Sequence, residues 1–376
     1  MAPLHSTALQ VILGEQRLVI EWDDGEQRDF DYVWLYDNAP TARDPRNGQR
    51  VIESIDIPPN IRPTAVTLMA NNQIELLWPD GSAPSVFSAD WLRHYGEAGD
   101  PPDDLFREKV FWDASLAALP RANYAELAEQ GRALRDWLYA VAQYGFAILH
   151  GVPIASEALF KVVDLFGHVR ETNYGRYFDV KSVVNPTNLA YTGLALSPHT
   201  DNPYRDPVPT LQLLHCLQAV DNGGASILVD GFAVAQQLLR TAPEHYKMLT
   251  TLPLYFRFQD QTTNLLASAT MIEVNAHQEV AAIRYNNRSL EPLTCGPELS
   301  EKFYAAYRAF GRMINDPANQ ITFKLAPGDL FIVDNERVLH GRTGFSSGGS
   351  RHLQGCYADR DGLLSTLRML SKTVVQ

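Results

Sequence analysis

Many short apolar runs, each about the length of one β-strand, constrain the fold of this chain more than any other feature. Helical periodicity occurs at 124–144, 155–167 and 298–315, and these segments flank the strands without alternating with them one by one. Helices that flank many short strands favour a β-sandwich or barrel with helical support over a doubly wound parallel sheet. The strand-like runs are "PTLQLLHCLQ", "ASILVDG", "MIEVNAH", "VAAIRYNN", "ITFKLAPGDLFIVDN" and "SRHLQGCYAD".

A second β-rich region precedes these strands. Residues 9–95 contain short apolar runs broken by the turn signals "DDG", "NN" and "PDG". The next segment, "GEAGDPPDD" at 96–104, is polar and rich in proline and glycine, as linkers are. We therefore predict a small β-rich N-terminal domain over 1–98 and a larger domain over 105–376.

Composition excludes several classes of function. The net charge of −12 disfavours binding to nucleic acid or to anionic membranes, which requires concentrated lysine and arginine. No apolar run reaches 18 residues, and the N-terminus lacks the pattern of a signal peptide. The three cysteines are far apart and form no C-x-x-C pair, which disfavours a disulfide framework. The expectation is a cytoplasmic protein that binds neither nucleic acid nor membrane.

Two histidines, an aspartate and an arginine stand near the ends of strand-like runs. His199 and Asp201 form "HTD", His340 lies in "DNERVLHGR", and Arg351 follows in "SRHLQG". Each alone is as often or more often a structural or surface residue. Together, two imidazoles and one carboxylate leave three positions open on a metal, which suits non-haem Fe(II) in oxygenases. The guanidinium fork suits a carboxylate of a dicarboxylate co-substrate.

These motifs carry a resemblance to a known family. The set "HTD", "DNERVLHGRT" and "SRHLQGCYADRD" resembles the Fe(II)/2-oxoglutarate dioxygenases of the taurine dioxygenase superfamily, most of all its γ-butyrobetaine and trimethyllysine hydroxylase branch. "WLYDN" and "WLRHYGE" match the small N-terminal domain of that branch, while "NYGRYFDV", "NLAYTG", "LQLLHC" and "RYNNRS" match its catalytic domain. The resemblance implies a mixed, β-dominated fold, with a double-stranded β-helix (jelly roll) and flanking helices.

The resemblance also implies cofactors, partners and residue roles. Fe(II) would be held by the two histidines and the aspartate, with 2-oxoglutarate and O₂ as co-substrates. Arg351 would bind the C5 carboxylate of 2-oxoglutarate, and the Ser226 hydroxyl would also contact the co-substrate. A small-molecule substrate and a homodimer are expected. Eukaryotic members hold a structural zinc through cysteines after the "WL-x-DN" motif; here "DNAPTARDPRN" has none, and His94 alone is no zinc site. We predict a zinc-free N-terminal domain.

Aromatic residues at family positions suggest a cage for a trimethylammonium group. Such a cation cannot donate a hydrogen bond, and ring faces hold it by cation–π attraction, at about 1–2 kcal/mol for each desolvated ring. The alternative is that these rings are ordinary core residues. The candidate cage residues are Tyr174, Phe178, Tyr191 and Tyr357.

Polar residues at other family positions should bind an anionic end of the substrate. They are Asn188, Asn202 and the Asn286–Asn287 pair, and Arg288 follows this pair in "YNNRS". Arg288 either points to solvent or adds a cation for a more highly charged group such as a phosphonate.

These features predict an enzyme that hydroxylates a small trimethylammonium compound at the carbon β to nitrogen. The favoured substrate is 2-(trimethylammonio)ethylphosphonate, and the alternative is γ-butyrobetaine, which would yield carnitine. Trimethyllysine would require an added acid and base for its amino acid end. A non-catalytic cupin-like binding protein is a distant alternative, because such a protein would lack one of the four metal-site and arginine residues.

Overall fold

The computed structural model of the chain describes residues 7–95, 108–127, 129, 131–181, 194–220, 222–345 and 351–372. The chain separates into two compact units, Met1–Asp104 and Leu105–Gln376. We retain 1–98 and 105–376 as the proposed domain limits. No helix among the described residues is long and apolar enough to cross a membrane.

The small unit consists of two antiparallel sheets with the orders β1-β2-β3 and β4-β5-β6, as expected for a β-rich domain. Its core is apolar and rich in aromatic side chains, and Leu18, Ile20 and Trp22 are fully buried in it. The elements are β1 (Ala8–Leu13), β2 (Arg17–Trp22), β3 (Gln27–Asp31), α1 (Tyr32–Asp37), β4 (Ala65–Leu68), β5 (Gln73–Leu77), β6 (Ser85–Ser88) and α2 (Ala89–Tyr95), with 3₁₀ turns η1 (Pro40–Ala42) and η2 (Ser54–Asp56).

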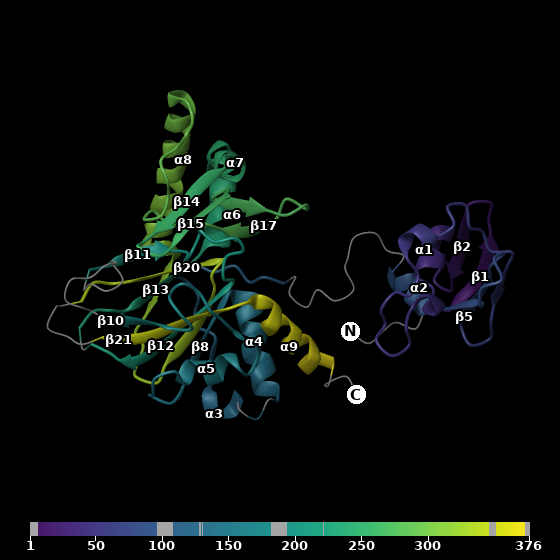
Figure 1. Cartoon of the computed structure of the whole chain (residues 1–376), viewed down its shortest axis with the longest axis horizontal. Helices are drawn as coiled ribbons and strands as arrows, with labels where there is room; N and C mark the ends of the chain where they lie inside the picture. Colours follow the sequence, from purple (N-terminus) through teal and green to yellow (C-terminus); the bar gives the residue numbers. More distant parts are fainter. Residues whose placement is uncertain are drawn as a thin grey trace. The chain divides into compact units, whose positions relative to one another are not determined.

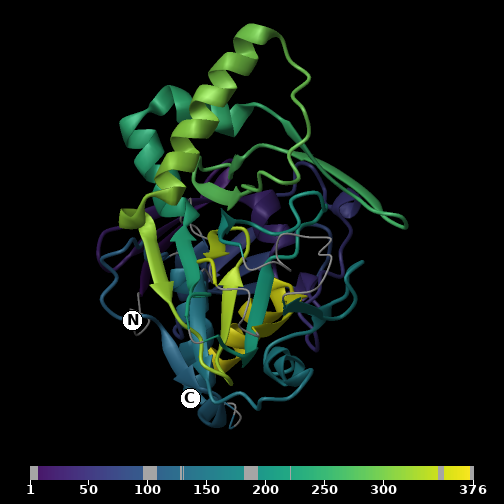
Figure 2. The same cartoon turned by 90° about the vertical axis from the view of Figure 1, so that its left-hand side faces the viewer.

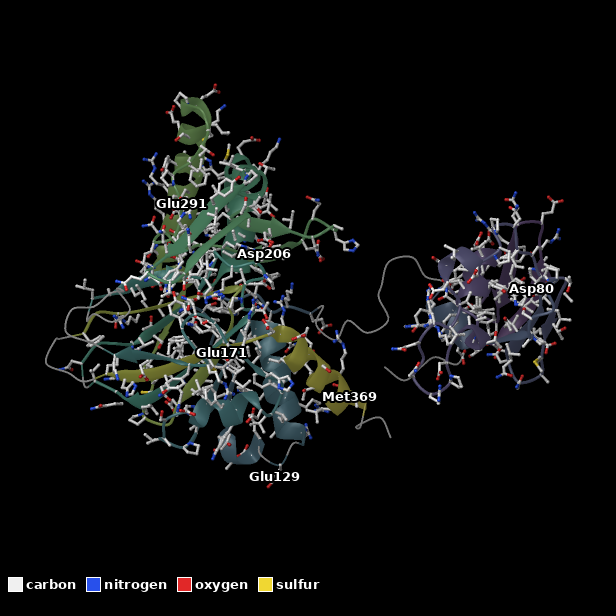
Figure 3. The ribbon with its side chains drawn as sticks, in the orientation of Figure 1. Asp80, Glu129, Glu171, Asp206, Glu291 and Met369 are labelled. Carbon is white, nitrogen blue, oxygen red and sulfur yellow. The ribbon has the colours of Figure 1, made fainter. Side chains whose placement is uncertain are left out.

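Local hydrogen bonds connect the parts of the small unit. The Tyr32 hydroxyl donates to the carbonyl oxygens of Gly14 and Arg17 at 2.7 and 2.9 Å, which ties α1 to the β1–β2 turn. The Tyr36 hydroxyl donates to Asp80, labelled in Figure 3, at 2.8 Å, which ties α1 to the turn after β5. The zinc-free small unit stays a prediction.

The large unit is dominated by strands, with helices at its periphery (Figure 1). Its strands are β7 (Arg121–Asn123), β8 (Phe146–His150), β9 (Val169–Arg170), β10 (Phe178–Lys181), β11 (Leu196–His199), β12 (Leu211–Gln218), β13 (Ser226–Asp230), β14 (Leu254–Gln259), β15 (Asn264–Ala269), β16 (Ile272–Val274), β17 (Val280–Ile283), β18 (Gln320–Phe323), β19 (Leu330–Asp334), β20 (Val338–Arg342) and β21 (His352–Ala358). Its helices are α3 (Tyr124–Leu127), α4 (Arg132–Tyr144), α5 (Ala158–Val163), α6 (Gly231–Thr241), α7 (Pro243–Thr251), α8 (Pro297–Asn315) and α9 (Arg360–Lys372), with the 3₁₀ turn η4 (Pro317–Asn319).

Two sheets of this unit enclose a common interior. The larger has the order β10-β21-β12-β19-β8-β7, with β9 beside β21, and the smaller has the order β11-β20-β13-β18. Figure 2 shows the strands of the smaller sheet side by side. Apolar side chains from both sheets, among them Phe331, Leu214 and Leu228, pack together in one cluster. The predicted β-dominated catalytic fold with flanking helices is therefore confirmed.

The alternation of side chains along the strands creates the layers. In β12, Leu211 and Leu213 pack with α4, α5 and α9, whereas Gln212 and Leu214 face the interior between the sheets. Burying one such leucine is worth about 1.5–3 kcal/mol. The helices α6, α7 and α8 pack around a separate apolar core beyond the smaller sheet. Each sheet thus has helices on one face and the shared interior on the other.

Several helical segments differ from the sequence prediction. The segment 124–144 contains two helices, α3 and α4, and Gly131, a poor helix former, precedes the second one. Helix α5 is shorter than the predicted 155–167. Helices α6, α7 and α9 were not predicted. Asp230 caps α6 through the backbone N–H groups of residues 232 and 233, a signal that the sequence does contain.

Helix α9 has one buried face. Leu363 and Leu367 are buried, one turn apart, while Met369, labelled in Figure 3, is 64 % exposed. The buried pair packs with α4 in the core beneath the larger sheet.

Candidate active site

The two predicted histidines face each other across neighbouring strands. His199 is the last residue of β11, and His340 is the middle residue of β20. They are direct partners in the antiparallel register, with ring centroids 4.5 Å apart. Residues 141 positions apart in the sequence therefore meet only because β11 and β20 pair.

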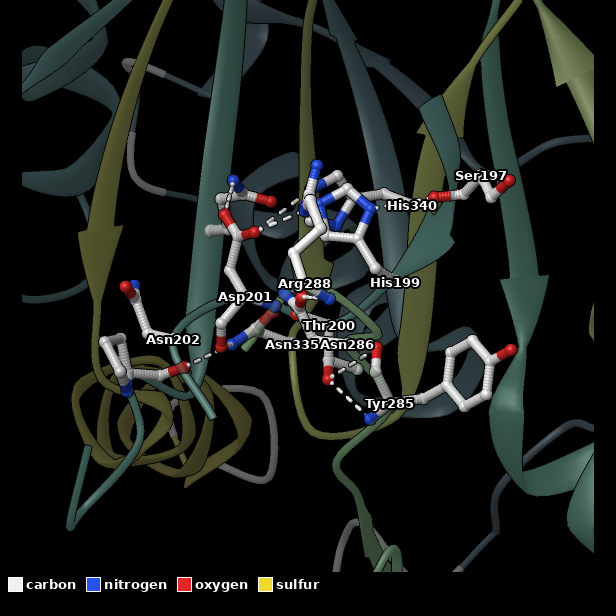
Figure 4. Close-up of polar contacts among 12 residues, drawn as sticks. Ser197, His199, Thr200, Asp201, Asn202, Tyr285, Asn286, Arg288, Asn335 and His340 are labelled. Carbon is white, nitrogen blue, oxygen red and sulfur yellow. Dashed lines mark hydrogen bonds and ion pairs between the residues drawn. The ribbon is translucent and has the colours of Figure 1, made fainter. Parts of the chain in front are cut away.

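Asp201 completes the group just beyond the end of β11. Its Oδ1 atom lies 3.2 Å from His199 Nε2 and 3.8 Å from His340 Nε2. One ligand atom of each residue lies within 4.8 Å of the others, which is the spacing of donors around one metal ion. Figure 4 shows all three side chains converging. In the described part of the chain this is the only such group of three or more metal-binding residues.

Asp201 is fixed from two sides. Asn335 accepts from its backbone N–H at 2.7 Å and donates to its carbonyl oxygen at 3.0 Å (Figure 4). The carboxylate oxygen Oδ2 accepts from Gln212 at 2.6 Å and from the Tyr357 hydroxyl at 2.8 Å. These bonds leave Oδ1 directed at the imidazoles. Partners of this kind orient a metal ligand and tune its affinity.

The protonation states also suit a metal. His199 Nδ1 lies 2.9 Å from the carbonyl oxygen of Ser197, and a proton on Nδ1 leaves Nε2 with its lone pair toward Asp201. Burial lowers the pKa of His340 to about 3, with opposing attraction from Asp201, so the imidazole is neutral. Burial alone would raise the pKa of Asp201, but the neighbouring His340 and His199 outweigh this effect and hold the pKa well below its usual range. Two imidazoles and one carboxylate are the donor set expected for Fe(II).

A cavity of about 440 Å³ opens from this group, lined by both sheets. Most of the residues that the sequence suggested as binding residues lie in its wall. Asn287 does not line it, although the neighbouring Asn286 does. Asn188 and Tyr191 lie outside the described residues. The suggested residues that line the cavity are Tyr174, Phe178, Asn202, Ser226, Arg288, Arg351 and Tyr357.

One end of the cavity is strongly cationic. Arg351 and Arg342 are only 6 % and 5 % exposed, and both line it. Burial, with repulsion from Arg351 and Arg288, lowers the pKa of Arg342 to about 10, so it stays charged. Arg342 was not predicted, although it is two residues after His340 and so faces the same side of β20. Its guanidinium donates to the Leu194 carbonyl oxygen.

An aromatic wall lies on the side of Tyr174. Its ring centroid is 6.4 Å from that of Phe178, which in turn is 5.2 Å from that of Tyr357. Two further rings were not predicted: Phe258 is 5.7 Å from Tyr174 and 5.2 Å from Tyr204. The hydroxyls of Tyr174 and Tyr204 are 2.8 Å apart. We call these five rings the aromatic wall; nothing in the spacing of Tyr204 and Phe258 along the sequence linked them to the others.

The fold and the site together define an Fe(II)- and 2-oxoglutarate-dependent dioxygenase, with His199, Asp201 and His340 as its facial triad. Residues 110–357 match the taurine catabolism dioxygenase TauD, TfdA family, and the chain belongs to this family. Residues 10–93 match the γ-butyrobetaine hydroxylase-like N-terminal family.

Curated relatives resemble the chain over nearly its whole length. A γ-butyrobetaine dioxygenase of Pseudomonas sp. (strain AK-1) is 36% identical, over 94% of this chain and 93% of that protein. A mitochondrial trimethyllysine dioxygenase of Rattus norvegicus is 32% identical, over 91% of this chain and 82% of that protein. The structure of a taurine dioxygenase from Burkholderia xenovorans gives a TM-score of 0.48 at 17% identity, covering 65% of this chain and 89% of that chain. The homodimer and the cytoplasmic location stay predictions.

Proposed function

We propose that this dioxygenase hydroxylates a small trimethylammonium compound with an anionic end, and that γ-butyrobetaine is the first candidate. The aromatic wall is the observation that carries the proposal. When bound, Fe(II) with 2-oxoglutarate and O₂ supplies the oxidant for hydroxylation of a C–H bond. The residues of the chain orient the substrate and exclude water.

The aromatic wall suits a quaternary ammonium group. Tyr174, Phe178 and Tyr357 offer ring faces and edges to the same cavity, and Tyr204 and Phe258 extend this surface. A desolvated trimethylammonium gains about 1–2 kcal/mol from each well-placed ring. Tyr357 also donates to Asp201, so a cation held here would lie close to the triad. That closeness supports hydroxylation at the carbon β to nitrogen.

Asn202 is suited to bind a polar group of the substrate. Its side chain is 3 % exposed and lines the cavity. The Oδ1 atom accepts from the Tyr204 hydroxyl at 2.8 Å, and within the described residues the buried Nδ2 donor has no partner. A buried donor without an acceptor costs about 1–3 kcal/mol, and a ligand oxygen would remove this cost.

The cavity lining supports γ-butyrobetaine over trimethyllysine as a candidate substrate. Trimethyllysine carries an α-ammonium group, which calls for a carboxylate at the anionic end. Among the described lining residues, Asp201 is the only carboxylate, and it belongs to the triad. γ-Butyrobetaine requires only a cation for its carboxylate, and Arg288 is available in the lining.

The phosphonate favoured by the sequence becomes the second candidate. The relatives described above are named for γ-butyrobetaine and trimethyllysine, which supports the carboxylate substrate. The positive charge of the cavity keeps the phosphonate in consideration, because Arg288, Arg342 and Arg351 all line this one cavity. A near-dianionic phosphonate gains more from such a field than a carboxylate does.

Succinate formation from 2-oxoglutarate tests the proposal. The purified protein with Fe(II) is assayed with γ-butyrobetaine, 2-(trimethylammonio)ethylphosphonate, trimethyllysine and taurine. We expect γ-butyrobetaine to stimulate succinate formation most and taurine, which has no trimethylammonium group, not at all. Faster turnover of the phosphonate would replace the first candidate with the second. Stimulation by taurine alone would exclude the trimethylammonium class.

A further inference from the structure

A second concave surface lies beside the active-site cavity. It is a groove of about 560 Å³ between the outer side of β11, the turn at 285–288 and helix α8. Helix α8 contacts β11, and both are labelled in Figure 1. Tyr307 donates to Asn287 at 2.9 Å, which joins α8 to the turn. We call this surface the arginine groove, after Arg288, Arg308 and Arg312 in its wall.

The charge of the groove is opposite to that of the chain. The protein carries −12 overall, yet no described carboxylate lines the groove. Arg308 and Arg312 are exposed and one turn apart on α8, an arrangement that destabilises a helix slightly. Among the described residues neither makes an ion pair. Asp316, four residues after Arg312, turns away to accept from the backbone N–H of Ala318. The groove therefore presents guanidinium groups that are not neutralised locally.

The groove joins the active-site cavity. Leu196, His199, Asn286 and Arg288 line both, so the two concave surfaces meet at these residues. Figure 4 shows the Arg288 side chain extending toward the imidazoles of the triad. Arginines therefore line a continuous path. Arg308 and Arg312 are exposed in the groove, Arg288 lies at the junction, and Arg351 is buried in the cavity.

We propose that the arginine groove binds small dianions and guides the dicarboxylate 2-oxoglutarate into the active-site cavity. In an acidic protein, a dianion is repelled at long range, and a local cationic path reverses that repulsion. Electrostatic guidance of this kind raises association rates and weakens with salt. The proposal rests on the co-substrate of the family and not on the proposed substrate, so either can fail alone.

The test compares two double variants with equal charge change. Arg308→Gln/Arg312→Gln removes the outer cations of the groove. Arg240→Gln/Lys247→Gln removes exposed cations of α6 and α7 that line neither surface. Binding of 2-oxoglutarate to the O₂-free, Fe(II)-loaded protein is followed by stopped-flow absorption at low and high salt. We expect the groove variant to associate on the order of tenfold more slowly at low salt, with little difference at high salt, and the control to match wild type.

A metal-free measurement separates the groove from the iron site. Inorganic phosphate, a dianion probe, should raise the unfolding temperature of wild type and of Arg351→Gln, but less that of the groove variant. Arg308→Lys/Arg312→Lys, which keeps the charge, should retain the wild-type association rate. Equal association rates for the groove and control variants at low salt would overturn the proposal. A slow rate that persists at high salt would also overturn it, because it would indicate altered structure.

Discussion

Two groups of lining residues in the active-site cavity differ in how firmly they are held: the triad, here called the metal end, and the residues proposed to bind the anionic end of the substrate, here called the anionic end. At the metal end, Asp201 has partners on its backbone N–H, its carbonyl and its carboxylate, and His199 is oriented by Ser197. At the anionic end, the Arg288 side chain is exposed and forms no ion pair among the described residues. Asn202, which accepts from Tyr204 of the aromatic wall, keeps a buried donor without a partner among the described residues.

This difference matches what each end has to do. The facial triad requires one geometry whatever the substrate, and hydrogen bonds around it remove alternatives in advance. In the proposed function, the anionic end recognises a group that differs between candidate substrates, and an exposed side chain can be replaced or reoriented at little cost in stability. The residues of the triad are therefore firmly held, and Arg288, which we propose as a specificity residue, is weakly held.

The largest expected effect is at the metal end. His199→Ala removes one of three protein ligands, and we expect it to abolish turnover while the fold survives, because the side chain contributes to the site and not to an apolar core. Succinate formation and thermal unfolding measure the two outcomes. His277→Ala, an exposed histidine outside the cavity, is the control and should behave as wild type. Substantial turnover by His199→Ala would show that the triad is misassigned.

Arg351→Gln should produce the next largest effect. Losing one bidentate, charge-assisted pair with a carboxylate costs roughly 2–4 kcal/mol, a rise of about 30- to 1000-fold in the KM for 2-oxoglutarate. The KM for the prime substrate should change much less. The reverse pattern, with only the prime substrate affected, would assign Arg351 to the anionic end instead.

Tyr357→Phe sharpens the comparison, because Tyr357 belongs to the aromatic wall and also donates a hydrogen bond to Asp201. The ring stays and the hydrogen bond to Oδ2 is lost, so Fe(II) affinity should fall about 10- to 100-fold. The KM for the substrate should stay near wild type. Tyr174→Phe is the matched control, because its hydroxyl contacts Tyr204 and not Asp201. Equal Fe(II) affinities in the two variants would mean that the hydrogen bond from Tyr357 to Asp201 does not contribute to metal binding.

Arg288→Gln should have the smallest effect, and its selectivity is informative. An exposed charge contributes about 0.2–1 kcal/mol, so γ-butyrobetaine should bind up to about fivefold more weakly. The dianionic phosphonate should lose more. Tyr174→Ala should weaken the binding of both substrates alike, because in the proposed function the aromatic wall contacts only the trimethylammonium group. If Arg288→Gln impaired turnover as severely as His199→Ala, the contrast between the two ends would be wrong.

The sequence was sufficient for the features that short patterns encode. Strand-length runs and the linker composition indicated the β-dominated fold and its small N-terminal region, since alternation and turn residues act locally. The triad was found because "HTD" is compact, and because His340 and Arg351 lie in motifs shared with a family. Helices α6 and α9 were missed although Asp230 provides a capping signal and buried residues recur at helical spacing in both helices.

Only the tertiary structure decided which distant residues share a cavity. Asn335 reaches Asp201 across 134 positions, and Phe258 joins Tyr174 through a strand pair whose place in space no local pattern specifies. The arginine groove likewise unites a turn and a helix that pack against β11. Local propensity determines strands and turns over a few residues, whereas packing of whole sheets and helices determines which side chains meet. That is why the metal ligands could be inferred from the sequence, and why their supporting partners and the cationic groove could not.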